Sequence, residues 1–147
     1  MSIQDQEVFL SNIHPFGHLS PSQMSMCLQH MDIAYYPKDT ILISQNNIPN
    51  TFFIIIKGSV FEYSKENNLI MDYQSEDSFD SNSLIYGKCE HTFKVNEELI
   101  CYEIDKKAFL SLIKKNQEFK DFFLKDLVNK IKTLKDKEYT SELSSFM

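Results

Sequence analysis

The feature that most constrains the fold is a series of short apolar segments between residues 32 and 104, each closed by a polar turn. The segment 52–56 reads Phe-Phe-Ile-Ile-Ile, and a run without polar residues is typical of a strand buried on both faces. The segment 40–44 before it ends at the polar stretch 45–50. Strands spaced by about 8 to 12 residues are typical of an antiparallel sandwich or barrel. The middle of the chain therefore predicts an antiparallel β-domain.

The remaining strands are expected in the same part of the chain. Lys57 and Gly58 predict a turn between the segment 52–56 and a returning strand at 60–63. Further strands are expected at 33–36, 69–73, 92–95 and 99–104. These seven segments indicate about eight strands in all, and so predict the eight-stranded antiparallel jelly-roll architecture over residues 32–104, with a helical turn at 82–86.

Helices are expected before the roll. Residues 4–12 predict a short helix that turns Val8, Phe9 and Ile13 toward one side. A second helix is expected over residues 21–31. Its start carries a capping box, because Ser20 precedes a proline at the first helical position and Gln23 follows three residues after the cap.

The C-terminal part predicts two more helices within residues 105–138, followed by a polar tail or linker at 139–147. Asp105 is expected to cap the first helix and Asn116 the second. The second helix carries an apolar stripe that consists of Phe119, Phe122, Phe123, Leu127 and Ile131. Such a stripe either closes the core or contacts another protomer or domain, and we favour core packing because the roll needs a cover on that side. The order of elements predicts one mainly-β α+β domain over residues 1–138.

Charge and composition narrow the class of partner. The net charge of −6 disfavours nucleic acid and anionic membranes, and no apolar run approaches the roughly 20 residues of a membrane span. The first residues lack the basic start of a secretory signal. The three cysteines show no C-x-x-C spacing, which favours reduced thiols and a cytoplasmic location.

Two stretches resemble a known family. Tyr-Tyr-Pro-Lys-Asp-Thr at 35–40 and Ile-Ile-Lys-Gly-Ser-Val at 55–60 are similar to the first half of cyclic-nucleotide-binding domains, and the resemblance extends over roughly residues 7–135. The segments 13–16, 35–37 and 119–123 resemble one bacterial subgroup more closely. In that subgroup the domain precedes a CBS-domain pair and a nucleotidyltransferase-like domain. The segment 142–147 resembles the stretch that leads into those CBS domains.

The resemblance implies a phosphate-binding cassette in residues 78–92. In the family the cassette is similar to Phe-Gly-Glu-x-x-Leu-Leu followed by Pro-Arg-x-Ala, where Arg pairs with the cyclic phosphate and Glu holds the ribose 2′-hydroxyl. In this sequence the Gly, Glu and Arg positions hold Asp80, Ser81 and Glu90. The resemblance implies ligand contacts from Phe79, Asp80, Ser81, Asn82, Ser83, Leu84, Glu90, His91 and Thr92.

The substitutions in the cassette predict weak binding of cyclic nucleotides. A charge-assisted hydrogen bond contributes about 1.5–3 kcal/mol, and the arginine that would make it is absent. A carboxylate about 4 Å from a phosphate repels it by about 4 kcal/mol at an effective dielectric constant of about 20. Because a micromolar ligand binds with about 8 kcal/mol in total, we expect the affinity for cyclic AMP or GMP to be millimolar or weaker.

The sequence therefore predicts a non-enzymatic regulatory module without a cofactor, which acts on a downstream domain of a larger protein or on a second protomer, as in a homodimer. The alternative is a functional nucleotide sensor with a divergent pocket, whose unusual ligand contacts come from Asp80, Ser81, Asn82, Ser83, Lys88 and Glu90. A cupin-like metal enzyme is a third hypothesis. It is disfavoured because His14, His18, His30 and His91 form no His-x-His pair. No arrangement typical of a catalytic site stands out.

Overall fold

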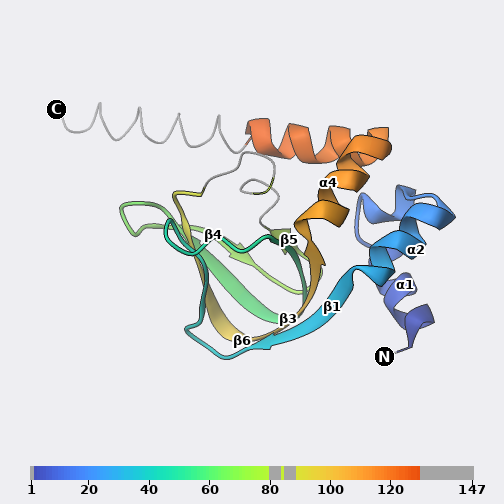
Figure 1. Cartoon of the computed structure of the whole chain (residues 1–147). Helices are drawn as coiled ribbons and strands as arrows, with labels where there is room; N and C mark the ends of the chain where they lie inside the picture. The colour runs from blue at the N-terminus through green and yellow to red at the C-terminus, as the bar shows by residue number, and fades with distance from the viewer. Residues whose placement is uncertain (1, 80–83, 85–88, 130–147) are drawn as a thin grey trace.

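The computed structural model describes residues 2–79, 84 and 89–129. Two helices and a 3-10 turn come first, six strands follow, and the described chain ends in helices (Figure 1). The helical elements are α1 (Ile3–Ser11), η1 (Phe16–His18), α2 (Pro21–Gln29) and α4 (Lys106–Lys115). Residues 117–129 are also helical. The strands are β1 (Met31–Tyr36), β2 (Ile41–Ile43), β3 (Thr51–Tyr63), β4 (Leu69–Tyr73), β5 (Ser78–Phe79) and β6 (Thr92–Asp105). This order confirms the predicted α+β roll with flanking helices.

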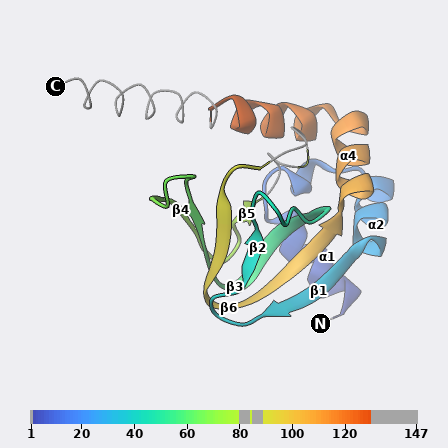
Figure 2. The same ribbon diagram turned by 60° about the vertical axis from the view of Figure 1, so that its left-hand side comes forward.

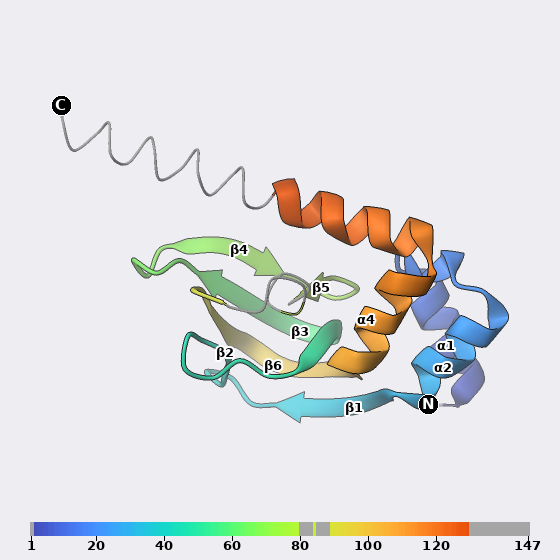
Figure 3. The same ribbon diagram turned by 45° about the horizontal axis from the view of Figure 1, so that its top comes forward.

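All strand pairs are antiparallel, and β3 and β6 form the centre of the sheet. The sheet has the order β1-β6-β3-β4, with β2 paired to β6 and β5 paired to β3. The sheet curls around its own inner face, while α1, α2 and α4 gather at one end of the roll (Figures 2 and 3). One face of the central strands therefore lines the interior of the roll, and the other face packs against the helices.

The predicted turn at Lys57 and Gly58 is wrong, because β3 is continuous through both residues. The register between β3 and β6 shifts at this point, and Gly58 has a φ of 103°. A bulge therefore replaces the turn and bends one long strand. The predicted strands 92–95 and 99–104 likewise belong to one strand, β6. These two mergers reduce the number of strands, whereas the short strand β5 was not among the expected segments, so the described residues form six strands.

The predicted capping box at the start of α2 is confirmed. The backbone N–H of Gln23 donates to Ser20 Oγ at 3.2 Å, and the backbone N–H of Ser20 donates to Gln23 Oε1 at 3.0 Å. The apolar side of the first helix differs in part from the prediction. Val8 is 61% exposed, whereas Leu10 is fully buried, and Phe9 packs at the margin of the core as expected.

Both predicted caps of the C-terminal helices are confirmed. Asp105 Oδ1 accepts a hydrogen bond from the Ala108 backbone N–H at 2.8 Å, and Asn116 Oδ1 accepts one from the Phe119 backbone N–H at 3.0 Å. Asn116 Nδ2 also donates to the His18 carbonyl oxygen at 3.1 Å, which ties the helix 117–129 to η1. The predicted helical residues 130–138 and the tail 139–147 lie outside the described residues.

Replacement of Asp105 by alanine should lower the free energy of unfolding by about 1 kcal/mol, because α4 loses the acceptor for its first-turn N–H. Asp105 Oδ2 also lies 2.9 Å from His30 Nδ1, but both side chains are half exposed, so this ion pair contributes little. Urea denaturation of Asp105→Ala and Asp105→Asn measures the effect. An asparagine variant as unstable as the alanine variant would contradict the capping role.

The helix-side core is built around aromatic rings. Phe52 of β3 stacks on Phe109 of α4 with ring centroids 4.5 Å apart. Phe119 and Phe123 are buried in the same cluster, which confirms that these two residues of the stripe pack in the core. Phe122 and Leu127 are only partly buried, and Ile131 lies outside the described residues.

Candidate functional site

Stacked aromatic rings fill the interior of the roll. Phe79 of β5 lies parallel to Phe53 of β3, with centroids 4.8 Å apart and an interplanar angle of 8°. Phe79 also stacks on Phe93 of β6 at 5.4 Å and 12°. Tyr73 of β4 completes the group at 5.4 Å from Phe79. The predicted ligand contact Phe79 is therefore part of a packed cluster.

A buried carboxylate lies beside these rings. Glu62 of β3 is only 7% exposed. Tyr73 Oη donates a hydrogen bond to Glu62 Oε1 at 2.6 Å, and His91 Nδ1 donates to Glu62 Oε2 at 2.6 Å. Each oxygen of the carboxylate thus accepts a short hydrogen bond, which compensates for the loss of water around a buried charge. We call Glu62, Tyr73 and His91 the inner triad.

The strand register explains how the inner triad assembles. Glu62 lies opposite Phe93 on one neighbouring strand and opposite Met71 on the other. His91 and Tyr73 are each two residues from those partners, and therefore occupy diagonal positions on the same face. Diagonal neighbours are within reach of long side chains. The pairing of β3 with β4 and β6 thus places the imidazole of His91 and the phenol of Tyr73 beside the Glu62 carboxylate.

The electrostatics of the inner triad follow from these contacts. The hydrogen bond from His91 to Glu62 raises the pKa of His91 above its usual value, while burial opposes the rise. The charges of Glu62, Glu90 and Glu66 add to it. Burial, followed by the charge and hydrogen bond of Glu62, raises the pKa of Tyr73. The arrangement therefore favours a protonated His91 and a neutral Tyr73 around an ionised Glu62.

The structure brings only part of the predicted cassette together. His91 belongs to the inner triad, and Thr92 pairs with Tyr63 in the sheet. Leu84 is buried in the helix-side core, and Glu90 is exposed. Four further predicted contacts lie outside the described residues: Asp80, Ser81, Asn82 and Ser83.

Sequence reasoning missed Glu62 and Tyr73. A signal for Glu62 was present, because Val60 is apolar and Glu62 is two residues later on the same face of an alternating strand. A charged residue at an inward position is a candidate for a buried polar site. The partner Tyr73 carries no comparable signal, since an inward tyrosine is ordinary in a β-domain.

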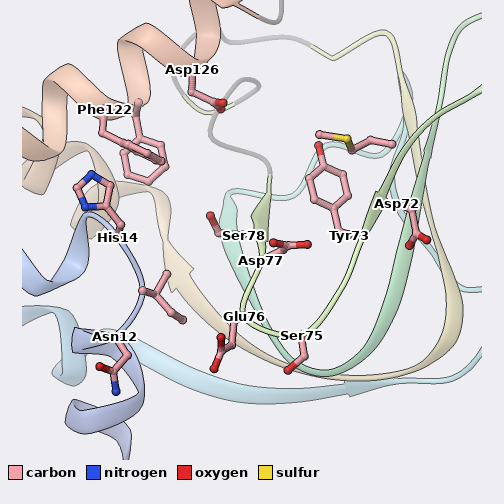
Figure 4. A pocket seen from close by; sticks show the side chains of 13 residues that line it. Asn12, His14, Asp72, Tyr73, Ser75, Glu76, Asp77, Ser78, Phe122 and Asp126 are labelled. Carbon is pink, nitrogen blue, oxygen red and sulfur yellow. The ribbon is translucent and has the colours of Figure 1, made fainter.

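A cavity of about 480 Å³ lies between the loop after α1, strand β4, the β4–β5 turn and the helix 117–129 (Figure 4). Its described lining includes four carboxylates: Asp72, Glu76, Asp77 and Asp126. Two of them accept hydrogen bonds from Gln74, Asp77 from the backbone N–H at 2.8 Å and Asp72 from Nε2 at 2.6 Å. The cavity also carries His14 and the ring of Phe122 on its helical side (Figure 4). Carboxylates on one wall of a cavity attract cations more than anions.

Over residues 2–79, 84 and 89–129, no group of three or more His, Cys, Asp or Glu side chains could hold a metal ion. Within that part of the chain, no helix has both the length and the apolar character to span a membrane. Burial raises the pKa of the Cys27 and Cys101 thiols to about 12, so both are protonated at neutral pH.

An antiparallel roll closed at one end by N-terminal and C-terminal helices defines the class of helix-flanked β-roll domains. Residues 33–116 match the family model of the cyclic nucleotide-binding domain. The chain belongs to this family and has the cyclic-nucleotide-binding fold.

Solved structures agree with this fold. The cAMP-bound PfPKA-R fragment has a TM-score of 0.79 and 21% identity, over 91% of this chain and 46% of its own length. The regulatory domain of Toxoplasma gondii PKA with cAMP has a TM-score of 0.76 and 14% identity, over 86% of this chain and 50% of its own. The chain thus spans about half the length of these two structures.

A third structure matches nearly from end to end. The sensor domain of the transcriptional regulator DNR from Pseudomonas aeruginosa has a TM-score of 0.74 and 19% identity, over 84% of this chain and 91% of its own. A search of curated protein sequences gave no significant match.

Proposed function

We propose that this chain is a non-enzymatic regulatory module that does not bind cyclic AMP or GMP in the standard way. The observation that carries the proposal is the inner triad. Inside the roll, the side chain of His91 is already paired with the Glu62 carboxylate. A neutral pair offers no net attraction to a phosphate. Since the arginine position of the cassette holds Glu90, the expected cation is also absent there.

The carboxylates around the inner triad disfavour the binding of anions. An anion about 4 Å from an additional carboxylate loses about 4 kcal/mol at an effective dielectric constant of about 20. Glu90 and Glu66 lie close enough to raise the pKa of His91 by their charges, so both act on the same region. The cavity lined by Asp72 and Asp126 adds further negative potential nearby.

We propose that the module acts through its helices. Phe119 and Phe123 anchor the helix 117–129 in the core, whereas Phe122 remains partly exposed. The same helix contacts the N-terminal region, because His18 Nδ1 lies 2.6 Å from Glu118 Oε2 and the ring of His14 lies 4.8 Å from that of Phe122. A shift of the sheet would therefore move both helical regions together.

The partner in this proposal is a neighbouring domain of a larger protein or a second protomer. The PfPKA-R and Toxoplasma gondii structures are about twice as long as the matched region, which supports a modular role. The resemblance to domains that precede CBS and nucleotidyltransferase-like domains suggests the same arrangement. We also propose a cytoplasmic location, in keeping with the buried thiols of Cys27 and Cys101.

Titration calorimetry with cyclic AMP and cyclic GMP tests the proposal. Wild-type protein should show no saturable heat at ligand concentrations up to about 1 mM, because a weaker complex is held by less than about 4 kcal/mol. Glu90→Arg should bind cyclic AMP at least about tenfold more tightly than wild type, since it replaces a repulsive charge by an attractive one.

The matched control is Glu90→Gln, which removes the negative charge without adding a cation. Its affinity should fall between those of wild type and Glu90→Arg. Micromolar binding by wild type, with one site per chain, would contradict the proposal and support the divergent nucleotide sensor. A panel of other mononucleotides and dinucleotides in the same experiment identifies the ligand of such a sensor.

A further inference from the structure

The inner triad fastens three neighbouring strands at one point. Glu62 lies on β3, Tyr73 at the end of β4 and His91 directly before β6. Because β3 lies between β6 and β4, the hydrogen bonds that Glu62 makes with Tyr73 and with His91 cross from one strand to the next. The side chains of His91 and Glu62 are 18% and 9% exposed, so water screens the pair only weakly. The pair is therefore a cross-strand tie whose strength depends on its charges.

Among the described residues, three carboxylates raise the pKa of His91 by their charge or by a hydrogen bond. Glu62 faces it from β3, Glu66 from the β3–β4 turn and Glu90 from its own segment. Asp77 of the β4–β5 turn and Asp126 of the helix 117–129 act on Tyr73 at the other end of the triad. The nearest lysine on β6, Lys94, lies 3.7 Å from Asp39 and is engaged there.

We propose that the inner triad is a proton-dependent clasp of the roll, which is fastened when His91 carries its proton and loosened when it does not. This proposal deepens the proposed function and rests on it, since it assigns a regulatory input other than a cyclic nucleotide to the interior of the roll. In the fastened state a charge-assisted hydrogen bond joins His91 to Glu62. In the loosened state a neutral imidazole still donates a hydrogen bond to the Glu62 carboxylate, but the attraction between two opposite charges is lost.

The direction of the pH effect follows from the raised pKa of His91 in the folded protein. A base whose pKa is raised by folding stabilises the folded state fully below its unfolded pKa, which is about 6.5 for histidine. This contribution is lost as the pH rises through the folded pKa. The clasp is therefore fastened in mildly acidic solution and loosens on the alkaline side.

Two measurements on the protein test the clasp. NMR titration of the His91 ring should give a midpoint above the ordinary value of about 6.5 in wild type, and a midpoint at or below that value in Glu62→Gln. Hydrogen exchange, corrected for the intrinsic rate at each pH, should show about tenfold weaker protection of amides 61–63 and 92–93 at pH 9 than at pH 6. In His91→Gln this pH dependence should disappear.

The matched control is Glu66→Gln, which removes one nearby charge but leaves the inner triad intact. It should retain most of the pH dependence. The proposal is overturned when His91 of wild type titrates at or below 6.5, a measurement that needs no variant, or when His91→Gln shows the same pH dependence as wild type. A uniform loss of protection at both pH values in His91→Gln, with no pH effect in wild type, also overturns it. Because no nucleotide is added, this outcome is independent of the calorimetry.

Discussion

Replacement of Gly58 by alanine should destabilise the fold by about 2–4 kcal/mol, the sum of a conformational penalty and a steric clash. Gly58 has a φ of 103°, which side-chain-bearing L-residues rarely adopt. A Cβ atom there would lie 2.1 Å from the carbonyl oxygen of Glu98 and 3.0 Å from that of Glu97. Both contacts are with the backbone of β6, so a change of rotamer does not relieve them.

The central pair of strands would have to separate to accept the methyl group. Denaturation in urea at 25 °C measures the loss, and circular dichroism shows whether the sheet remains. Lys57→Ala is the matched control, because Lys57 is adjacent and exposed, and its replacement should change stability by less than about 0.5 kcal/mol. A Gly58→Ala variant as stable as the control would show that the bulge tolerates a side chain.

The second large effect is expected from Phe123→Ala, which should cost about 3–5 kcal/mol, as is usual for truncation of a buried phenylalanine. Phe123 is 2% exposed, and its ring lies 5.4 Å from that of Phe52 and 5.2 Å from that of Phe109. Its removal leaves a cavity between the helix 117–129 and the central strand. The helix would then lose its main attachment to the sheet.

Phe122→Ala is the matched control on the same helix. Phe122 is partly exposed and contacts His14 at the margin of the core, so truncation should cost only about 1 kcal/mol. Equilibrium denaturation of both variants gives the difference. Equal losses would mean that the stripe does not divide into a buried anchor and an exposed surface, and would weaken the proposal that the exposed part contacts a partner.

The predictions that succeeded from the sequence depend on local interactions. Ser20 with Gln23, and Asp105 with Ala108, are three residues apart, and a cap forms wherever such a spacing meets a helix start. The burial of Phe119 and Phe123 follows from helical periodicity. For these features the neighbours in the chain are also the neighbours in space.

The predictions that failed depend on residues far apart in the sequence. Whether Gly58 makes a turn or a bulge is decided by β6, whose Glu98 carbonyl passes close to it across the sheet. The sequence places a glycine there but does not show which strand runs alongside. The exposure of Val8 has a similar origin, because the packing of α1 against Phe16 and Tyr102 determines which side of the helix is buried.

By itself, the sequence determined the order of the elements, the predicted helix caps, the burial of Phe119 and Phe123, and the absence of arginine from residues 78–95. Only the tertiary structure decided that two pairs of predicted strands are continuous and that the buried carboxylate of the roll is Glu62. The physical reason is that Glu62, Tyr73 and His91 are brought together by the register of three strands. The ionisation of each then depends on partners that local sequence does not reveal.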